Sequence, residues 1–439
     1  MNEITSALLL LTPLLPLVLA FPSLRSRISY PCYIALIPAI VLFVVASIDS
    51  LSVAVELPWL LFGSGLGVNG ASRWLLAMSV VIWTAAATLQ QTTGNHAADN
   101  RFTVFFLLTM AGNLGAIVAT DMVGFFSFSA LMGYAFYGLL VGGGDKTARR
   151  TGRIYISFMI AADLLLFEVL LIAASTTSEM AFEAVRLAVS GSPSPGLYVS
   201  LALAGFALKA GFWPFHSWLP LAFRSSPPAV AVLIGGVPIA MGLLGIVRWL
   251  PLGEITLPGT GLTIQILGVA AILYAIVEGV KRAQLKLLPA YAVMCATGLF
   301  TVTLGAALAD PAIWNQYGNM PYVYIVSLGF GVVVMVAVVS LLQQHRRTSA
   351  AHAQQAADSS LWIERCAGAV VRWGRETGFK TLPRLGVSWR TMAGRFLQSP
   401  VWHKALDTAE NSLQRWMIAI TLFLLLGIAV ILAAGIFTG

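Results

Sequence analysis

Charge is scarce in this 439-residue sequence. Lys, Arg, Asp and Glu together account for 10% of the residues, whereas hydrophobic residues account for 58%. A soluble domain carries roughly 25% charged residues. The deficit excludes an ordinary soluble protein and predicts a polytopic membrane protein.

Cysteine and known cofactor motifs are also scarce. Cys32, Cys295 and Cys366 stand alone, without the spacing of a disulfide framework, a metal site or an iron–sulfur site. No Walker A motif, haem-type histidine pair or nucleophile elbow is present, and GSGLGVNG (63–70) is interpreted as a turn between spans. These absences predict no cofactor, no metal and no redox chemistry in the chain itself. Whether the chain belongs to an enzyme complex is left open.

Long apolar segments fill most of the sequence. A membrane-crossing helix needs about 20 mostly apolar residues. The segments that meet this requirement are 4–22, 31–49, 72–90, 102–120, 122–142, 153–174, 197–214, 227–249, 261–280, 287–308, 321–343 and 414–437. We therefore expect an all-α membrane helix bundle of about twelve transmembrane helices. The first segment lacks a basic region and a cleavage site, so we interpret it as a span rather than a signal peptide.

The basic residues determine the expected orientation. With the N-terminus outside, all of the 26 Lys and Arg residues except Arg73, Arg186, Arg248 and Lys209 fall on the cytoplasmic side. This distribution predicts a bacterial cytoplasmic (inner) membrane protein with both termini outside. The net charge of +8 then reflects the excess of basic residues in cytoplasmic loops, and nucleic acid is not an expected partner.

The segment 344–413 differs from the rest of the chain. It is polar and basic, but Leu361, Trp362, Cys366, Val370 and Trp373 recur at intervals that place them on one face of a helix. We expect a membrane bundle over 1–343, then a cytoplasmic linker and an amphipathic interfacial helix, and a C-terminal transmembrane helix over 414–439. The alternative for the middle segment is a linker with scattered apolar residues.

Lys209 lies within the apolar stretch FALKAGFWPFHSWLPLAF, residues 206–223. A lysine at the centre of a membrane helix costs roughly 2.5–3.5 kcal/mol. Burial disfavours the charged form of a lysine and a nearby carboxylate favours it, so such a group can exchange a proton. The alternative is an amine that extends to the membrane surface. Pro214 and Pro220 are expected to break the helix after Lys209.

The residues from Lys209 onward resemble a known signature. K-A-G-F-W-P-F-H-S-W-L-P-L-A-F is similar to K-S-A-Q-x-P-F-H-x-W-L-P-D-A-M, found in the proton-conducting membrane subunits of complex I. The same family includes Mrp-type antiporters, membrane-bound hydrogenases and the membrane subunit of DAB-type inorganic-carbon accumulators. GLLGIVR (242–248) and LKLLPAYAVMCATG (285–298) resemble further family segments, and the resemblance covers roughly residues 55–310.

The resemblance implies a fold and a set of proton-transfer residues. The family fold contains two inverted five-helix repeats, and here its core would cover about 102–308, with a broken seventh helix and a truncated second repeat. Lys209 would hold the proton in the first repeat, and Asp163 matches the sixth-helix aspartate of the family. His216 is a possible proton relay or a packing residue. Lys286, which matches a family lysine, is a further proton-transfer candidate.

The sequence departs from the family pattern at several positions. Ala130 replaces the fifth-helix glutamate, Ile234 replaces the eighth-helix histidine, and Leu221 replaces an aspartate. The eleventh span, 321–343, carries no charged residue where the family has a second lysine. A complete, independent antiporter channel is therefore not expected.

Glu168 could compensate for the missing glutamate. It follows Asp163 by five positions, which turns it about 140° around a helix, so the two carboxylates cannot share a face. We expect Asp163 to pair with Lys209. Glu168, if buried, would either replace the missing charge or remain protonated with one hydrogen bond.

The favoured function is a proton-conducting, antiporter-like subunit of a complex I-like redox pump, of the quinone oxidoreductase or hydrogenase type. Its partners would be other membrane subunits, a peripheral catalytic subunit, the lipid bilayer, and protons or Na⁺. One alternative is the membrane subunit of a DAB-type CO₂/bicarbonate uptake system driven by the proton gradient. The other is a degenerate structural scaffold.

Overall fold

The computed structural model describes residues 2–25, 27–48, 53–56, 64–92, 99–282 and 284–352. These residues fall into two units, one that ends at Ala337 and one that begins at Val338, and each is described by itself. The predicted amphipathic helix around Trp362 and the predicted span 414–437 lie outside the described residues.

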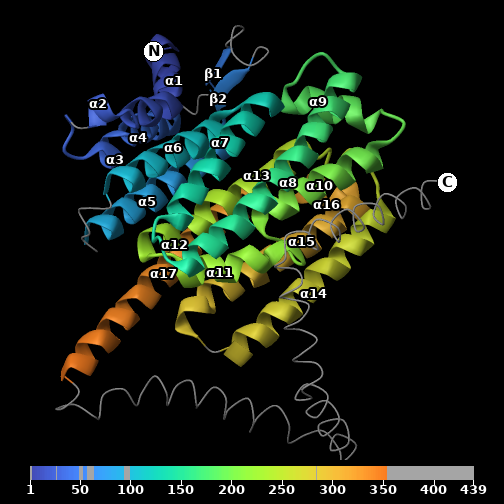
Figure 1. Ribbon diagram of the computed structural model, residues 1–439. Helices are drawn as coiled ribbons and strands as arrows, with labels where there is room; N and C mark the ends of the chain where they lie inside the picture. Colours follow the sequence, from blue (N-terminus) through green and yellow to red (C-terminus); the bar gives the residue numbers. More distant parts are fainter. Residues whose placement is uncertain are drawn as a thin grey trace, which may run out of the picture. The chain divides into compact units, whose positions relative to one another are not determined.

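Helices dominate the described chain (Figure 1). They are α1 (Asn2–Leu19), α2 (Pro22–Arg25), α3 (Pro31–Ile34), α4 (Ile37–Ile48), α5 (Gly70–Thr92), α6 (Asp99–Val118), α7 (Met122–Val141), α8 (Lys146–Thr176), α9 (Phe182–Ser190), α10 (Pro195–Ala210), α11 (Trp218–Ser225), α12 (Pro228–Ile234), α13 (Ala240–Trp249), α14 (Pro258–Arg282), α15 (Leu288–Ala309), α16 (Pro311–Tyr317) and α17 (Met320–His352). Short turns complete the order: the 3₁₀ turns η2 (Phe215–Ser217) and η4 (Leu285–Leu287), and the π-helical turn η3 (Gly235–Ile239).

The predicted spans coincide closely with these helices. Within the described residues, nine helical segments are long and apolar enough to cross a membrane, and two shorter apolar helices lie at Glu3–Leu19 and Pro31–Ser47. Each predicted span before residue 344 falls on one of them. The chain is an all-α, multi-pass membrane protein in which hydrophobic length alone was sufficient to locate the helices.

The interpretation of residues 63–70 as a turn is wrong. Gly65–Val68 forms strand β2, which pairs antiparallel with β1 (Val53–Glu56), with Val53 opposite Val68. Asp121 holds this hairpin, because its carboxylate accepts hydrogen bonds from the Gly65 N–H at 2.9 Å and the Ser64 hydroxyl at 3.1 Å. The same carboxylate caps the start of α7 through the Gly124 N–H. The anchor is distant in sequence, so residues 63–70 by themselves do not predict it.

Small residues allow close packing between α14 and α15. A Cβ atom at Gly261 would collide with the backbone of Gly305, and one at Gly268 would collide with the backbone of Gly298. Both helices therefore carry glycines two turns apart at their contact. Close approach of this kind is a usual basis of helix association in a membrane. Lipid tails are as apolar as the helix side chains, so the hydrophobic effect does not drive helices together there.

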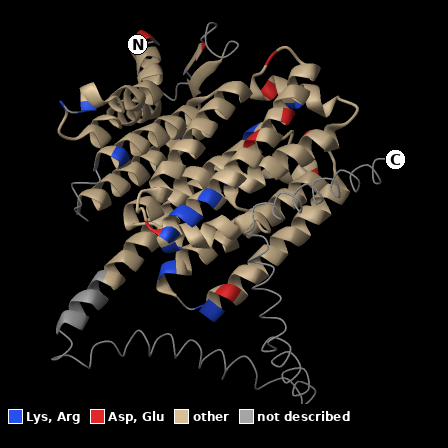
Figure 2. Ribbon diagram, viewed as in Figure 1, with Lys and Arg blue, Asp and Glu red and all other residues tan. Residues whose placement is uncertain are grey.

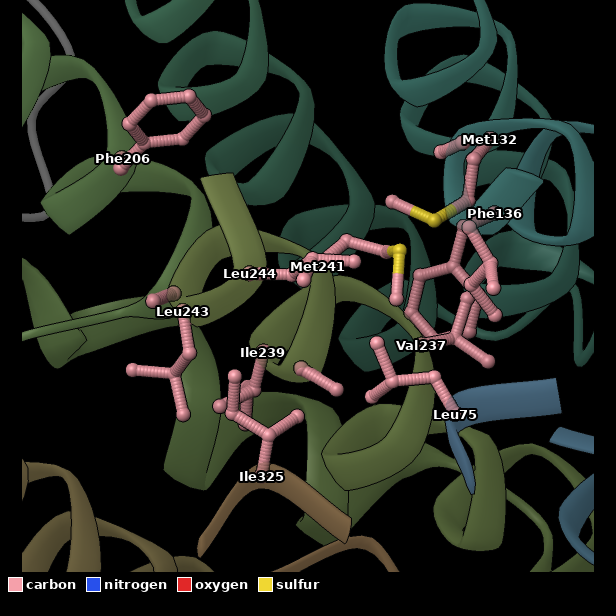
Figure 3. Close-up of a cluster of buried hydrophobic side chains, with 14 of the residues drawn as sticks. Leu75, Met132, Phe136, Phe206, Val237, Ile239, Met241, Leu243, Leu244 and Ile325 are labelled. Atoms are coloured by element: carbon pink, nitrogen blue, oxygen red, sulfur yellow. The ribbon is translucent and has the colours of Figure 1, made fainter. Parts of the chain in front are cut away.

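The centre of the first unit is apolar. The segment α12–η3–α13 is completely buried, and Gly235 and Gly236 of its π-helical turn pack on Val332 of α17 and Ile82 of α5. Figure 3 shows the cluster on this segment, whose drawn side chains contain only carbon and sulfur. Ile234, at the position of the family histidine, is fully buried in the same core. Apart from Arg248, the buried side chains of this segment carry no charge.

Arg248, which lies on α13, caps the C-terminal end of α6. Its guanidinium, buried near the end of α13, donates hydrogen bonds to the carbonyl oxygens of Ala116, Ile117 and Ala119 at 2.9, 2.7 and 3.2 Å. The last carbonyls of a helix have no partner within the helix, and a cation there also complements the helix dipole. Arg248 therefore holds α13 against the end of α6.

Replacing Arg248 should destabilise the folded protein. We expect Arg248→Gln to lower the free energy of unfolding by about 2–4 kcal/mol, because buried carbonyl oxygens lose their charged donor. The melting temperature of the detergent-purified protein measures the effect. Arg153→Gln, at an exposed position of α8, is the matched control and should change the melting temperature little. Equal melting temperatures for the two variants would contradict the assigned role.

Candidate functional site

A sharp break interrupts the helix that carries Lys209. α10 ends at Ala210, and Gly211 adopts the left-handed conformation with φ 66°. The Phe212 N–H donates to the Ala207 carbonyl at 2.9 Å and the Gly211 N–H donates to the Leu208 carbonyl at 3.4 Å, which is the Schellman pattern of a helix end. Gly211 therefore ends the helix, and a side chain there would also meet the ring of Trp218.

The two prolines have different positions in this break. Pro214 lies between α10 and η2, where the chain has already left the helix, and its peptide bond with Trp213 is cis. Pro220 lies in the first turn of α11. The N–H groups of a first turn have no acceptor within the helix, so a proline there removes no hydrogen bond. Pro220 therefore breaks no helix, contrary to the expectation from the sequence.

Lys209 forms a buried ion pair. Its side chain is 2% exposed, and its Nζ lies 2.7 Å from Oδ1 of Asp163 on α8. The same Nζ donates a hydrogen bond to the Ser129 hydroxyl of α7 at 3.3 Å. This burial rules out the alternative in which the amine reaches the membrane surface. Three helices, α7, α8 and α10, meet at one ammonium group.

Local packing brings the partners of Lys209 together. Gly205 lies one turn before Lys209, and a Cβ there would collide with Leu166 of α8 and approach the Ala162 carbonyl. Because Gly205 has no side chain, α10 lies against α8 next to Asp163. Ala130 occupies the position of the missing family glutamate, and the adjacent Ser129 supplies a neutral oxygen to Lys209. Asp163 is the only acidic partner of Lys209 among the described residues.

Polar side chains extend from the pair toward the N-terminal end of α8. Tyr155 is buried, interacts electrostatically with Asp163 and packs edge-on against Trp218, with ring centroids 5.2 Å apart. The Tyr155 hydroxyl and the Trp218 Nε1 are buried without a hydrogen-bond partner. Farther along, the Ser225 hydroxyl donates to Thr151 at 3.2 Å. Buried donors are usually satisfied by protein or ordered water, so these groups form a polar side of the pair.

Ser129, Tyr155 and Trp218 were not selected by the sequence analysis. Ser129 adjoins Ala130, the position at which the family has its glutamate, and this proximity was the only available signal. Trp218 belongs to the family signature, but its position beside Gly211 depends on the break. Tyr155 precedes Asp163 by two helical turns, which alone does not distinguish it from a packing residue.

The remaining sequence candidates lie elsewhere. His216 is buried on η2, with its ring centroid 4.7 Å from that of Tyr274 on α14. Lys286 is exposed on η4, and its Nζ donates to the Arg224 carbonyl at the end of α11 at 3.2 Å. This contact is typical of helix capping. Proton transfer by His216 or Lys286 stays a prediction.

Glu168 does not replace the missing glutamate. Its side chain is exposed on α8, on the far side of the helix from buried Asp163. The predicted separation of the two carboxylates around the helix is therefore correct, but burial of Glu168, the condition for its role beside Lys209, is not met. Its position on the outer surface needs a different explanation.

Comparison with known proteins identifies the family. Residues 119–355 match the family described as NADH:quinone oxidoreductase/Mrp antiporter, TM. Hydrogenase-4 component B of Escherichia coli is 26% identical over 210 residues, which are 46% of this chain and 31% of that protein. A Na(+)/H(+) antiporter protein of Alkalihalophilus pseudofirmus is 27% identical over 219 residues, 49% of this chain and 44% of that protein. The chain thus spans less than half of either relative.

The fold also has a solved counterpart. One protein of the Mrp complex from Dietzia superimposes with a TM-score of 0.63 at 18% sequence identity, over 77% of this chain and 63% of that one. This likeness establishes the fold, and the family match confirms the resemblance found in the segment that follows Lys209.

The charges of Lys209 and Asp163 should be energetically coupled. Asp163→Asn leaves a buried ammonium and Lys209→Gln leaves a buried carboxylate, whereas the double variant leaves two neutral amides. We expect a double-mutant cycle, measured from unfolding in mixed micelles, to give a coupling free energy of about 1–3 kcal/mol.

The control is an ion pair of the same type near the surface. Glu278 and Arg282 are 3.0 Å apart at the end of α14, where Arg282 is partly exposed. The cycle Glu278→Gln with Arg282→Gln should give about 0.3–0.5 kcal/mol. Additive effects at Asp163 and Lys209 would show that the buried pair carries no special interaction.

Proposed function

Because the chain belongs to the NADH:quinone oxidoreductase/Mrp antiporter family of membrane proteins, we propose that it conducts protons as an antiporter-like subunit of a larger membrane complex. The observation that supports this function best is the buried ion pair of Lys209 and Asp163 directly before the helix break. A purely structural helix contact has no need of an ammonium group in an apolar interior.

The pair suits reversible protonation. Two charges in a low-dielectric interior lose their hydration, and only their mutual attraction and hydrogen bonds offset this loss. The ionised and neutral forms of such a pair are therefore closer in free energy than they are in water, and a nearby change of charge can shift the balance. In our proposal a proton leaves or reaches Lys209 through the polar side chains around Tyr155, with His216 as a second possible relay.

The distribution of charge supports the proposed orientation. Figure 2 shows Asp and Glu residues gathered at the end of the bundle where α9 lies, whereas Lys and Arg gather mainly around α11 and the last turn of α14. We propose that the basic end faces the cytoplasm of a bacterial cell, with the N-terminus on the opposite side. The proton path along α8 then opens toward the cytoplasm.

The apolar centre argues for dependence on partners. The described part of the second repeat carries no charged residue in α17 between Met320 and Gln343, and Arg248 is the only charged residue of the α12–η3–α13 segment. We propose a truncated second repeat and a single proton-exchanging site that is coupled to the reaction of a partner. A redox pump related to hydrogenases is the first candidate, since one relative is named as a hydrogenase component.

A second candidate is the membrane subunit of a DAB-type inorganic-carbon uptake system. The apolar second half favours it, because a subunit that only lets protons run down their gradient has no need of a second exchange site. Purification of the complex from native membranes distinguishes the two. Quinone- or hydrogenase-type subunits support the redox pump, and a single large zinc-containing cytoplasmic protein supports carbon uptake.

Lys209→Ala should abolish coupled activity without preventing assembly, and Asp163→Asn should weaken it. The measurement is proton movement into membrane vesicles, driven by the reaction of the intact complex and followed with a pH-sensitive dye. Lys281→Ala, which removes an exposed lysine at the end of α14, is the control and should leave proton movement unchanged. Wild-type proton movement in a fully assembled Lys209→Ala complex would favour a structural scaffold and overturn both transport functions.

A further inference from the structure

Glu168 lies beside a stripe of exposed apolar side chains on α8. Leu164 is 64% exposed, and Phe167 and Leu171 are each 50% exposed. With Ile160 they recur at alternating intervals of four and three residues, the spacing by which one helix packs along another. We call Ile160, Leu164, Phe167 and Leu171, together with Glu168, the outer stripe of α8.

Glu168 lies at the depth of the hydrocarbon. α8 has 31 residues; its basic first turns extend to Arg153, and its polar end is at Thr176. At a rise of 1.5 Å per residue, Glu168 is about 22 Å from Arg153 and about 12 Å from Thr176. The hydrocarbon core of a bilayer is about 30 Å thick. These distances place Glu168 within the hydrocarbon core, nearer to the Thr176 end of α8.

Exposure at this depth is unfavourable without a partner. An acidic side chain costs up to roughly 2.5–3.5 kcal/mol in a membrane helix, the upper value applying at the bilayer centre, and protonation still leaves its polar oxygen atoms in lipid. Within the part of the chain that the structure describes, Glu168 makes no ion pair or hydrogen bond. Asp163, on the same helix, forms an ion pair with Lys209. A basic side chain from a neighbouring helix would offset this cost.

We propose that the outer stripe of α8 binds a transmembrane helix of a different subunit, which places a Lys or Arg side chain against Glu168. A second copy of this chain fits less well. The described cations that lie inside its spans, Lys209 and Arg248, are both buried and already bound within the chain. The proposal rests on the proposed function only in that the chain is one subunit of a membrane complex.

The contact also has a consequence for the ion pair. Glu168 and Asp163 are separated by about 7.5 Å along the axis of α8. A change in the charge of the partner cation would therefore act on Asp163 across a single apolar helix, where screening by water is weak. The outer stripe would connect the partner electrostatically to Lys209.

Site-specific photo-crosslinking in native membranes tests the contact. We replace Leu164 or Leu171 with a photoreactive phenylalanine analogue in the full chain, expressed with its complex, and identify the crosslinked peptide. Leu273 of α14 is 59% exposed and equally apolar, and serves as the control position. We expect both α8 positions to capture one transmembrane peptide of another subunit that contains Lys or Arg, and the control position not to capture it.

Glu168→Gln tests the role of the charge. We expect it to lower the yield of this crosslink about threefold to tenfold, in line with measured interhelical polar contacts. Its melting temperature as a purified single chain should equal that of the wild type, because Glu168 has no partner within the described chain. A fall as large as that of Asp163→Asn would reveal an internal partner and overturn the proposal.

Other outcomes are equally decisive. Crosslinks from α8 to lipid alone, to a second copy of this chain, or to a transmembrane peptide without a basic residue would each overturn the proposed contact. Such a crosslinking result would refute the proposed interface only. The proposed function would still stand if partner subunits co-purify and Lys209→Ala abolishes coupling. If no subunit co-purifies with the wild type, the proposed function fails first.

Discussion

The buried contact between the ammonium of Lys209 and the carboxylate of Asp163 is the interaction on which the structure of the site depends. Each charge alone would be strongly unfavourable in an interior made of Leu, Val, Phe and Met side chains. At 2.7 Å they offset each other's lost hydration, and Ser129 provides one further oxygen. The contact therefore helps to hold α7, α8 and α10 together at this depth.

Two glycines near Lys209 make this contact possible, because neither has a side chain. Gly205 allows α10 to approach α8, and Gly211 ends α10 in a left-handed conformation directly after Lys209. The chain then continues through Pro214 and η2 into α11, which places the Trp218 ring beside the break. By contrast, the α12–η3–α13 segment is packed tightly with apolar side chains (Figure 3).

The two faces of α8 each carry one carboxylate in a different environment. Its inner face presents Asp163 to Lys209, and its outer face presents Glu168 to the membrane. A protein that worked alone would gain nothing from the second carboxylate at that depth. The exposed Glu168, the apolar α17 up to Gln343 and the absence of a second lysine there all agree with a subunit whose charge network is completed by a neighbour.

The sequence by itself located the apolar helices before residue 344, because a hydrophobic segment is a local property, although only nine of the eleven predicted spans are described helices long enough to cross a membrane. It also identified Lys209, since an ionisable residue within an apolar run is conspicuous in any context, whereas Asp163 was selected because it matches the family pattern. Tertiary structure decided what depends on distant partners. The β1–β2 hairpin requires Asp121, the cap on α6 requires Arg248, and the exposure of Glu168 depends on which face of α8 the other helices cover. Helical periodicity separates Asp163 from Glu168, but only packing shows which of the two lies inside.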